Sequence, residues 1–230
     1  MSVYRDPGYG EPTWMRVLRA LSASFRAGRF FGVELRIYWL TLVLLPLFFA
    51  FEFARVGRPF AEVTTLTLIA SVGLYAVVYV HEMSHILAAR RYGIHTPLIT
   101  LSPLGGVAHL STPAPTPRAE VWIALAGPAV HLPLLGIFWP LSMLIDPGMG
   151  RPEGWAESPL YFAVDFLRHV NLWLMLFNLL PVFPLDGGRV FRALLTMKLD
   201  ASKATRIACR VGQVGAVVFV VLGFLRDPPW

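Results

Sequence analysis

The sequence predicts an α-helical integral membrane protein with about five to six spans, one of them interrupted, and small membrane-associated strands or a hairpin. Composition is the first reason: 56% of the 230 residues are hydrophobic and only 15% are charged. A water-soluble domain of this length needs more charge to cover its surface. The second reason is that several apolar runs can cross the hydrocarbon of a bilayer, which takes about 20 helical residues. The third is a proline- and glycine-rich stretch between two of these runs.

Residues 1–30 are predicted to be a basic N-terminal leader or interfacial segment. Within "TWMRVLRALSASFR", residues 13–26, apolar side chains recur at helical spacing between arginines: Trp14, Leu18, Leu21 and Phe25. This pattern favours a short helix on the membrane surface, and a basic leader without fixed structure fits equally well. The following residues, 33–38, alternate apolar and polar side chains, which is typical of a strand.

Residues 31–230 are predicted to form one membrane-embedded domain. The segment 94–116, "IHTPLITLSPLGGVAHLSTPAPT", is too rich in proline, glycine and β-formers for a span and predicts a hairpin or re-entrant loop. The apolar run that begins near residue 160 passes into "PVFPLDGG" and then a short helical stretch, which predicts an interrupted span. The predicted spans are residues 38–53, 63–92, 121–145, 160–199 (interrupted) and 205–225.

Basic residues predict the orientation. They gather in the N-terminal segment, at Arg90, Arg91 and Arg118, and in the region 198–210, whereas the loops 52–62 and 146–157 are closer to neutral. By the positive-inside tendency the first group is cytoplasmic, so we expect a multi-pass protein of the cytoplasmic (inner) membrane with a cytoplasmic N-terminus. The net charge of +6 then serves orientation and contact with lipid headgroups, and not nucleic-acid binding.

The stretch "VYVHEMSHILAARRYG", residues 78–93, places two histidines and a glutamate in an apolar run. His81 and His85 are four residues apart, so on a helix they share one face and can bind one zinc ion. Glu82 is placed as the base that takes a proton from an attacking water. Ionisable groups at membrane depth are costly and usually functional. At about 1.5 Å per residue, both histidines lie roughly 7–13 Å inside the cytoplasmic edge marked by Arg90, so we expect metal-assisted peptide hydrolysis within the membrane.

A third zinc ligand is needed at similar depth, and Asp186 in "PLDGG" is the best candidate. Its alternative role is a helix N-cap, which aspartate suits well. Glu120 is a rival ligand, as in peptidases whose metal site is completed by a glutamate, but it stands two residues from Arg118. His131 is at a plausible depth and is a ligand, a donor to a ligand or a helix-packing polar group, with the last two preferred.

Together these motifs resemble the site-2 protease family of intramembrane zinc metalloproteases. The resemblance rests on "HEMSH" at 81–85 and "NLLPVFPLDGG" at 178–188, with support from "LSPLGGVAHL" at 101–110 and "LAGPAVHL" at 125–132. It implies one Zn²⁺ per chain held by His81, His85 and Asp186, with Glu82 as catalytic base. It also implies that Asn178 helps to position or unwind the substrate. The implied substrates are single-span membrane proteins, such as anti-sigma factors, that are cut in regulated intramembrane proteolysis.

Two features depart from the family. Its "GPxxN" pattern commonly ends in asparagine, where this sequence has His131, so the resemblance assigns no role to His131, and it is kept as an auxiliary candidate of the site. Many members also continue into a further span and CBS domains, whereas this sequence ends at "LRDPPW". We therefore expect a minimal or shortened member without CBS domains.

Alternatives remain at this stage. The main one is an intramembrane divalent-metal transporter, because intramembrane His and Asp also mark ion pathways. The others are a purely structural membrane protein, which predicts no bound metal, and a peptidase in which Glu120 holds the metal. For a protease, we expect an open strand edge from residues 94–110 or 30–38 to pair with the unwound substrate, and a polar passage to bring water from the cytoplasmic side.

Overall fold

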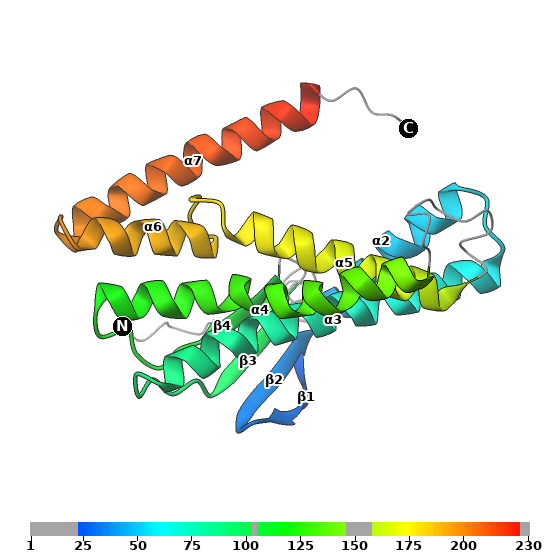
Figure 1. Ribbon diagram of the computed structural model, residues 1–230, viewed down its shortest axis with the longest axis horizontal. Coiled ribbons are helices and arrows are strands. Elements are labelled where there is room, and N and C mark those ends of the chain that lie inside the picture. The colour runs from blue at the N-terminus through cyan, green and yellow to red at the C-terminus, as the bar shows by residue number, and fades with distance from the viewer. Residues whose placement is uncertain (1–22, 103–104, 146–157, 226–230) are drawn as a thin grey trace, which may run out of the picture.

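The structure, a computed structural model, describes residues 23–102, 105–145 and 158–225. Helices make up most of these ranges, and a small sheet lies against one of them (Figure 1). The helices are α2 (Trp39–Arg55), α3 (Phe60–Arg90), α4 (Pro117–Ile145), α5 (Pro159–Asn178), α6 (Asp186–Thr196) and α7 (Ala201–Leu225). The strands are β1 (Ser24–Phe30), β2 (Val33–Tyr38), β3 (Leu98–Ser102) and β4 (Gly105–His109).

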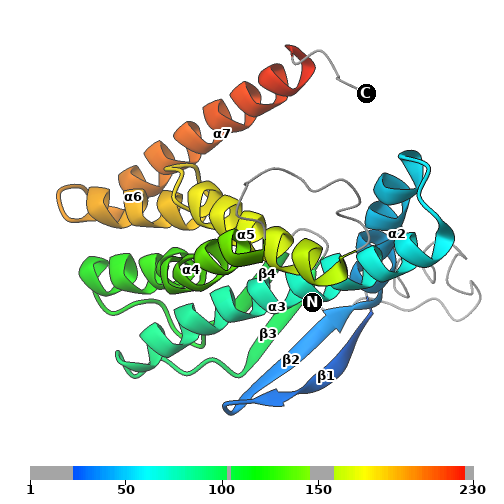
Figure 2. The same ribbon diagram turned by 45° about the vertical axis from the view of Figure 1, so that its right-hand side comes forward.

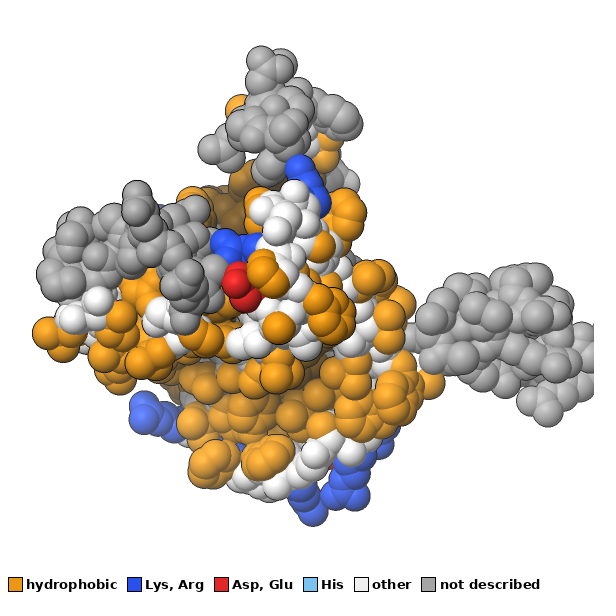
Figure 3. Space-filling model, turned by 90° about the vertical axis from the view of Figure 1, so that its right-hand side faces the viewer, with side chains coloured by type: hydrophobic (Ala, Val, Ile, Leu, Met, Phe, Trp, Pro, Cys, Tyr) orange, Lys and Arg blue, Asp and Glu red, His pale blue; other side chains and the backbone are white. Residues whose placement is uncertain are grey.

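Four described helices, α3, α4, α5 and α7, are long and apolar enough to cross a membrane. Helix α2 has 17 residues, which reach about 25 Å at 1.5 Å per residue, close to the thickness of the hydrocarbon. Hydrophobic side chains cover much of the described part of the face in Figure 3, as a lipid-facing surface requires. The prediction of a helical membrane protein is confirmed, although α3 and α4 begin three and four residues before the predicted spans, at Phe60 and Pro117.

Helix α3 is central and packs against α2, α4 and α5. Leu66 and Ala70 of α3 form a buried cluster with Phe162 of α5. On the other side of α3, the sheet packs against Met83 and Ile86. Met83 lies inside the HExxH motif, and Ile86 directly follows it. The turn of α3 that carries His81, Glu82 and His85 is therefore enclosed by neighbouring elements.

The interrupted span is confirmed. Helix α5 ends at Asn178 and α6 begins at Asp186, and the seven residues between them include two prolines, which lack a backbone N–H. Gly187 and Gly188 then pack against the backbone of this break, where a Cβ would lie within 3.0 Å of Leu180 and Phe183. The two glycines allow the start of α6 to fold back closely onto the end of α5.

The four strands form one sheet in the order β1-β2-β3-β4, with β2 and β3 parallel and the outer pairs antiparallel. Figures 1 and 2 show it against α3, on the side away from α6 and α7. The predicted strand at 33–38 is β2, and the predicted hairpin is β3 and β4. One alternative is wrong for each of two segments. Residues 24–26 begin β1 and are not part of a surface helix, while residues 13–22 lie outside the described chain. The strand β2 has no open edge, because it pairs on both sides.

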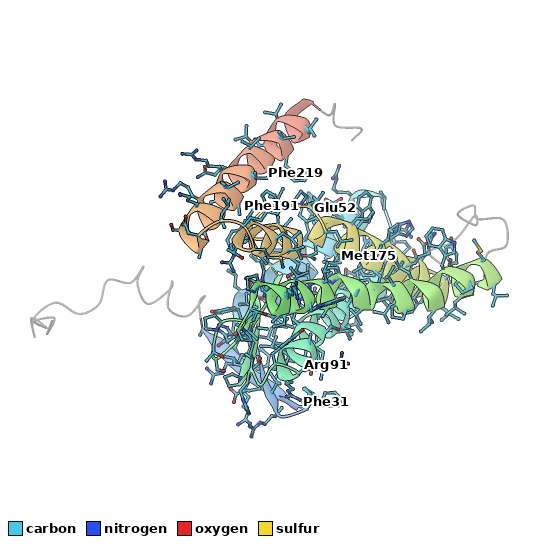
Figure 4. The ribbon with its side chains drawn as sticks, turned by 60° about the vertical axis from the view of Figure 1, so that its left-hand side comes forward. Phe31, Glu52, Arg91, Met175, Phe191 and Phe219 are labelled. Carbon is cyan, nitrogen blue, oxygen red and sulfur yellow. The ribbon has the colours of Figure 1, made fainter. Side chains whose placement is uncertain are left out.

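The far end of the hairpin β1–β2 contacts the end of α3, where Phe31 and Arg91 lie close to each other in Figure 4. There the neighbouring Arg90 donates a hydrogen bond from its guanidinium to the Phe31 carbonyl. The edge strands of the described sheet are β1 and β4, and β4 is the one that lies beside the HExxH motif.

Candidate metal centre

Three donor atoms from two helices meet at one point. Nε2 of His81 and Nε2 of His85 lie 3.1 Å apart, and each lies 3.1 Å from Oδ2 of Asp186. All three side chains are buried, and among the described residues they form the group able to hold a metal ion. The sequence separates Asp186 from His85 by about a hundred residues, and the break between α5 and α6 brings it to the face of α3.

The orientation of His85 suits metal binding. Its Nδ1 lies 2.7 Å from the backbone carbonyl of Ile123, which can only accept a hydrogen bond. Nδ1 therefore carries the hydrogen, and in the neutral ring the lone pair of Nε2 is directed to the point where the donor atoms of Asp186 and His81 converge. Metal-ligating histidines commonly donate their other ring N–H in this way.

The donor set fits a zinc ion. Tetrahedral ligands at 2.0–2.1 Å from zinc are about 3.3 Å from one another, close to the 3.1 Å separations found here. Two imidazole nitrogens and a carboxylate oxygen are also ligand types that zinc prefers. The other carboxylate oxygen of Asp186, Oδ1, accepts a hydrogen bond from Arg189 at 3.0 Å, which fixes the carboxylate plane.

Asp186 is not a helix cap. The N-cap of α6 is Leu185, and Asp186 is the first residue of the helix, with its carboxylate against the two histidines and Arg189. A negative side chain in the first helical turn is stabilised by the helix dipole. The alternative in which Asp186 only caps the helix is therefore wrong.

The Glu82 side chain is held by the edge strand. Oε2 accepts a hydrogen bond of 3.1 Å from the backbone N–H of Ala108 in β4. Gly106 of the same strand lies against the glutamate, because a Cβ at this position would be 2.5 Å from Cγ of Glu82. Glu82, the three donor residues, β4 and the end of α5 line one cavity of about 490 Å³.

Gly127 of α4 forms the floor under the two histidine rings. A Cβ here would lie 2.7 Å from Cε1 of His81 and nearer still to the His85 ring. This close approach explains why a glycine stands one turn before His131 in the "LAGPAVHL" motif.

The other candidate residues lie outside the group of three donor residues. Nδ1 of His81 lies 3.0 Å from Nε2 of His131, so His131 contacts a donor residue and stands outside the donor group. Asn178 lines the cavity, and its amide donates to the Leu174 carbonyl of its own helix at 3.0 Å. Glu120 forms an ion pair with Arg192 of α6 and is not part of the group of metal donors found in the described chain.

Two polar residues beside the site were missed by sequence reasoning. Asn171 of α5 is fully buried, with Oδ1 2.8 Å from Nδ1 of His131. Arg189 contacts Asp186 and lines both the first cavity and a second one of about 380 Å³, which Glu120 and Arg192 also line. Arg189 is detectable in the sequence, since it stands one helical turn after Asp186. Asn171 has no such signal.

The sequence is similar to those of known metalloproteases. The family model described as Peptidase family M50 matches residues 69–150 and 148–222. The chain is 37% identical over 203 residues to Rip3 of Mycobacterium tuberculosis, covering 85% of this chain and 50% of that protein. It is 29% identical over 206 residues to a zinc metalloprotease of Methanocaldococcus jannaschii, covering 89% and 55%. The chain thus spans about half the length of these relatives.

A solved structure is also similar. The site-2 protease from Methanocaldococcus jannaschii superimposes with a TM-score of 0.64 at 29% sequence identity. The match covers 90% of this chain and 87% of that one.

Proposed function

Because the chain belongs to peptidase family M50, we propose that it is a zinc-dependent intramembrane endopeptidase that hydrolyses peptide bonds within or near transmembrane segments of membrane-anchored proteins. One observation carries the proposal: the donors of His81, His85 and Asp186 converge in the cavity that Glu82 also lines. Of the helices that line this cavity, α3 and α5 are long and apolar enough to cross a membrane. A metal centre and a carboxylate base in such a setting support hydrolysis inside the bilayer.

Each of these residues has its own role in the proposed reaction. His81, His85 and Asp186 would hold zinc, which supplies a Lewis acid that polarises the scissile carbonyl. Glu82 takes a proton from the water whose oxygen attacks the carbonyl carbon. As the carbon–nitrogen bond breaks, Glu82 returns this proton to the leaving amine, so that a carboxylic acid and an amine are formed. The Ala108 N–H keeps the Glu82 carboxylate facing the cavity before the reaction.

Strand β4 supports recognition of an extended substrate. A transmembrane substrate arrives as a helix, and its backbone groups need new partners once the helix is unwound. An open strand edge offers such partners without requiring a particular sequence. Gly105–His109 lies at an edge of the sheet and lines the cavity at residues 105–108, so we propose that β4 pairs with the segment to be cut. The proposed role of Asn178 is to contact this segment from the opposite wall.

The proposed substrates are single-span membrane proteins, including anti-sigma factors cut in regulated intramembrane proteolysis, as the motif resemblance implies. The proposed location is the cytoplasmic membrane, with the N-terminus in the cytoplasm and the site towards that side. The end of α3, the start of α4 and the turn between α6 and α7 lie at one end of the molecule in Figure 1. These are the segments with the excess of basic residues, which supports the orientation. The second cavity, beside Arg189, is our candidate for the water passage.

The first experiment measures bound zinc in purified protein that remains folded in detergent. We expect about one zinc per chain in the wild type and a loss of zinc in Asp186→Ala, because the donor set is then incomplete. Glu120→Gln is the matched control and should keep its zinc, since Glu120 is paired with Arg192. Zinc retained in Asp186→Ala would overturn the assignment of this ligand.

The second experiment tests the reaction in proteoliposomes that contain a single-span substrate. Cleavage by the wild type and none by Glu82→Gln is the expected result. A transporter would instead move zinc across the vesicle membrane. Zinc flux that persists in Glu82→Gln, together with no cleavage by the wild type, would exclude the protease.

A further inference from the structure

We propose that Asn171 and His131 form a buried relay that fixes the position of the hydrogen on His81 and so keeps Nε2 of His81 free to bind the metal. This inference rests on the proposed function. Asn171 is then a positioning residue for His81, although the side chain of His131 lies between them. The relay runs through three helices, from α5 through α4 to α3.

The relay begins at a group whose role is unambiguous. Nδ2 of Asn171 donates a hydrogen bond of 2.7 Å to the backbone carbonyl of Leu167, one turn earlier in α5. A carbonyl oxygen can only accept, so the NH₂ end of the Asn171 amide faces Leu167 and the Oδ1 end faces His131. Asn171 and His131 are both 0% exposed, so water does not substitute for either partner.

The orientation of Asn171 fixes the hydrogen on His131. Oδ1 of Asn171 lies 2.8 Å from Nδ1 of His131 and is an acceptor, so Nδ1 carries the hydrogen. In the neutral ring, Nε2 of His131 is then an acceptor as well. It lies 3.0 Å from Nδ1 of His81, which must therefore be the donor of that hydrogen bond.

The consequence reaches the metal site. Since Nδ1 of His81 carries the hydrogen, the lone pair of its Nε2 is directed to the point where Oδ2 of Asp186 and Nε2 of His85 converge, which is where a metal ion would bind. The carbonyl of Ile123 does the same for His85 in a single step. The two ligands are thus oriented by different means, one by the backbone and one by two side chains.

Without Asn171, nothing in these contacts would keep the hydrogen of His131 on Nδ1. The ring could then carry it on Nε2, directly opposite Nδ1 of His81. Two N–H groups cannot face each other at 3.0 Å, so the hydrogen of His81 would move to Nε2 and occupy the position of the metal. Asn171→Leu should therefore weaken zinc binding although Asn171 touches no proposed ligand in the contacts described above.

The test measures zinc affinity by competition with a chelator, and the unfolding midpoint of each zinc-free protein. We expect a 10- to 100-fold lower affinity in Asn171→Leu and in His131→Leu, the range typical of lost outer partners of a metal ligand. His131→Gln should keep most of the affinity, because its amide oxygen can accept from His81 while its NH₂ donates to Asn171. Ser142→Ala is the control: Ser142 is buried in the same helix as His131, and its hydroxyl bonds only Trp139 in the described contacts.

The outcomes are distinct. Wild-type affinity in Asn171→Leu would overturn the relay, as would an equal loss in His131→Gln and His131→Leu, since packing alone would then explain it. A fall in zinc-free stability that accounts for the lower affinity would also overturn it. In each of these cases the wild type still binds zinc and cleaves its substrate. A wild type that binds no zinc would instead refute the proposed function, and the relay with it.

Discussion

The backbone N–H of Ala108 donates a hydrogen bond to Oε2 of Glu82 at 3.1 Å and ties the proposed catalytic base to the edge of the sheet. Strand β4 therefore has two proposed tasks, because it holds Glu82 and also offers its edge to the substrate. The same five residues set the position of the base and of the peptide bond. A shift of β4 should therefore reduce the rate of catalysis more than it reduces metal binding.

Gly106→Ala tests this coupling. The new Cβ would lie 2.5 Å from Cγ of Glu82, so the glutamate or the strand must move. Because misplacement of a catalytic group by about 1 Å can reduce the rate by about a hundredfold, we expect a large fall in kcat with zinc content unchanged. Gly136→Ala in α4 is the control, because a Cβ there meets nothing within 4 Å. Full activity in Gly106→Ala would show that Glu82 does not depend on this contact.

Glu82→Gln should bind zinc and lose cleavage. The amide is similar in size to the carboxylate, but it cannot take a proton from water, and general base catalysis contributes about 10²–10⁴-fold. Zinc content by metal analysis and cleavage in proteoliposomes are the two measurements. Activity within a few-fold of wild type would assign the base to another residue.

Gly127→Ala should damage the metal centre through packing alone. Its Cβ would overlap the His85 ring and approach Cε1 of His81 at 2.7 Å, and such overpacking costs about 1–3 kcal/mol. We expect less bound zinc and a lower unfolding midpoint. Gly136→Ala, in the same helix, is the matched control, because a Cβ there meets nothing within 4 Å. If both variants behaved alike, the fit of α4 against the two histidines would not matter.

Removal of zinc should destabilise the wild type. A ligand that binds only the folded state at a hundred times its Kd stabilises it by about 2.7 kcal/mol, and a chelator removes this contribution. The unfolding midpoint in detergent should fall on addition of the chelator and recover with added zinc. In Asp186→Ala the same chelator should change the midpoint little. An equal fall in both proteins would place the metal elsewhere.

Much of this arrangement could be predicted from the sequence because the signals are local. Helical spacing places His81 and His85 on one face, and the two prolines before Asp186 break a span where a third donor is needed. Hydropathy located the long helices to within a few residues at most ends. These features depend on neighbours in the sequence, which periodicity reports directly.

The missing parts depend on tertiary packing. The partner of Asn171 is 40 residues away on another helix, and nothing in the sequence near Asn171 distinguishes it from an ordinary helix-packing amide. The depth of His131 was predicted, but its partner could not be. Similarly, alternation predicted β2 as a strand but could not show that β1 and β3 cover both of its edges.

Helices α2 and α3 pack against each other, yet they differ greatly in length. Helix α2 has 17 residues and α3 has 31, which correspond to about 25 Å and 46 Å. A flat bilayer of uniform thickness cannot match both, so α3 must tilt or the lipid beside α2 must thin. The hydrophobic mismatch is therefore built into this pair of helices, and either a tilt of α3 or a thinner bilayer beside α2 must accommodate it.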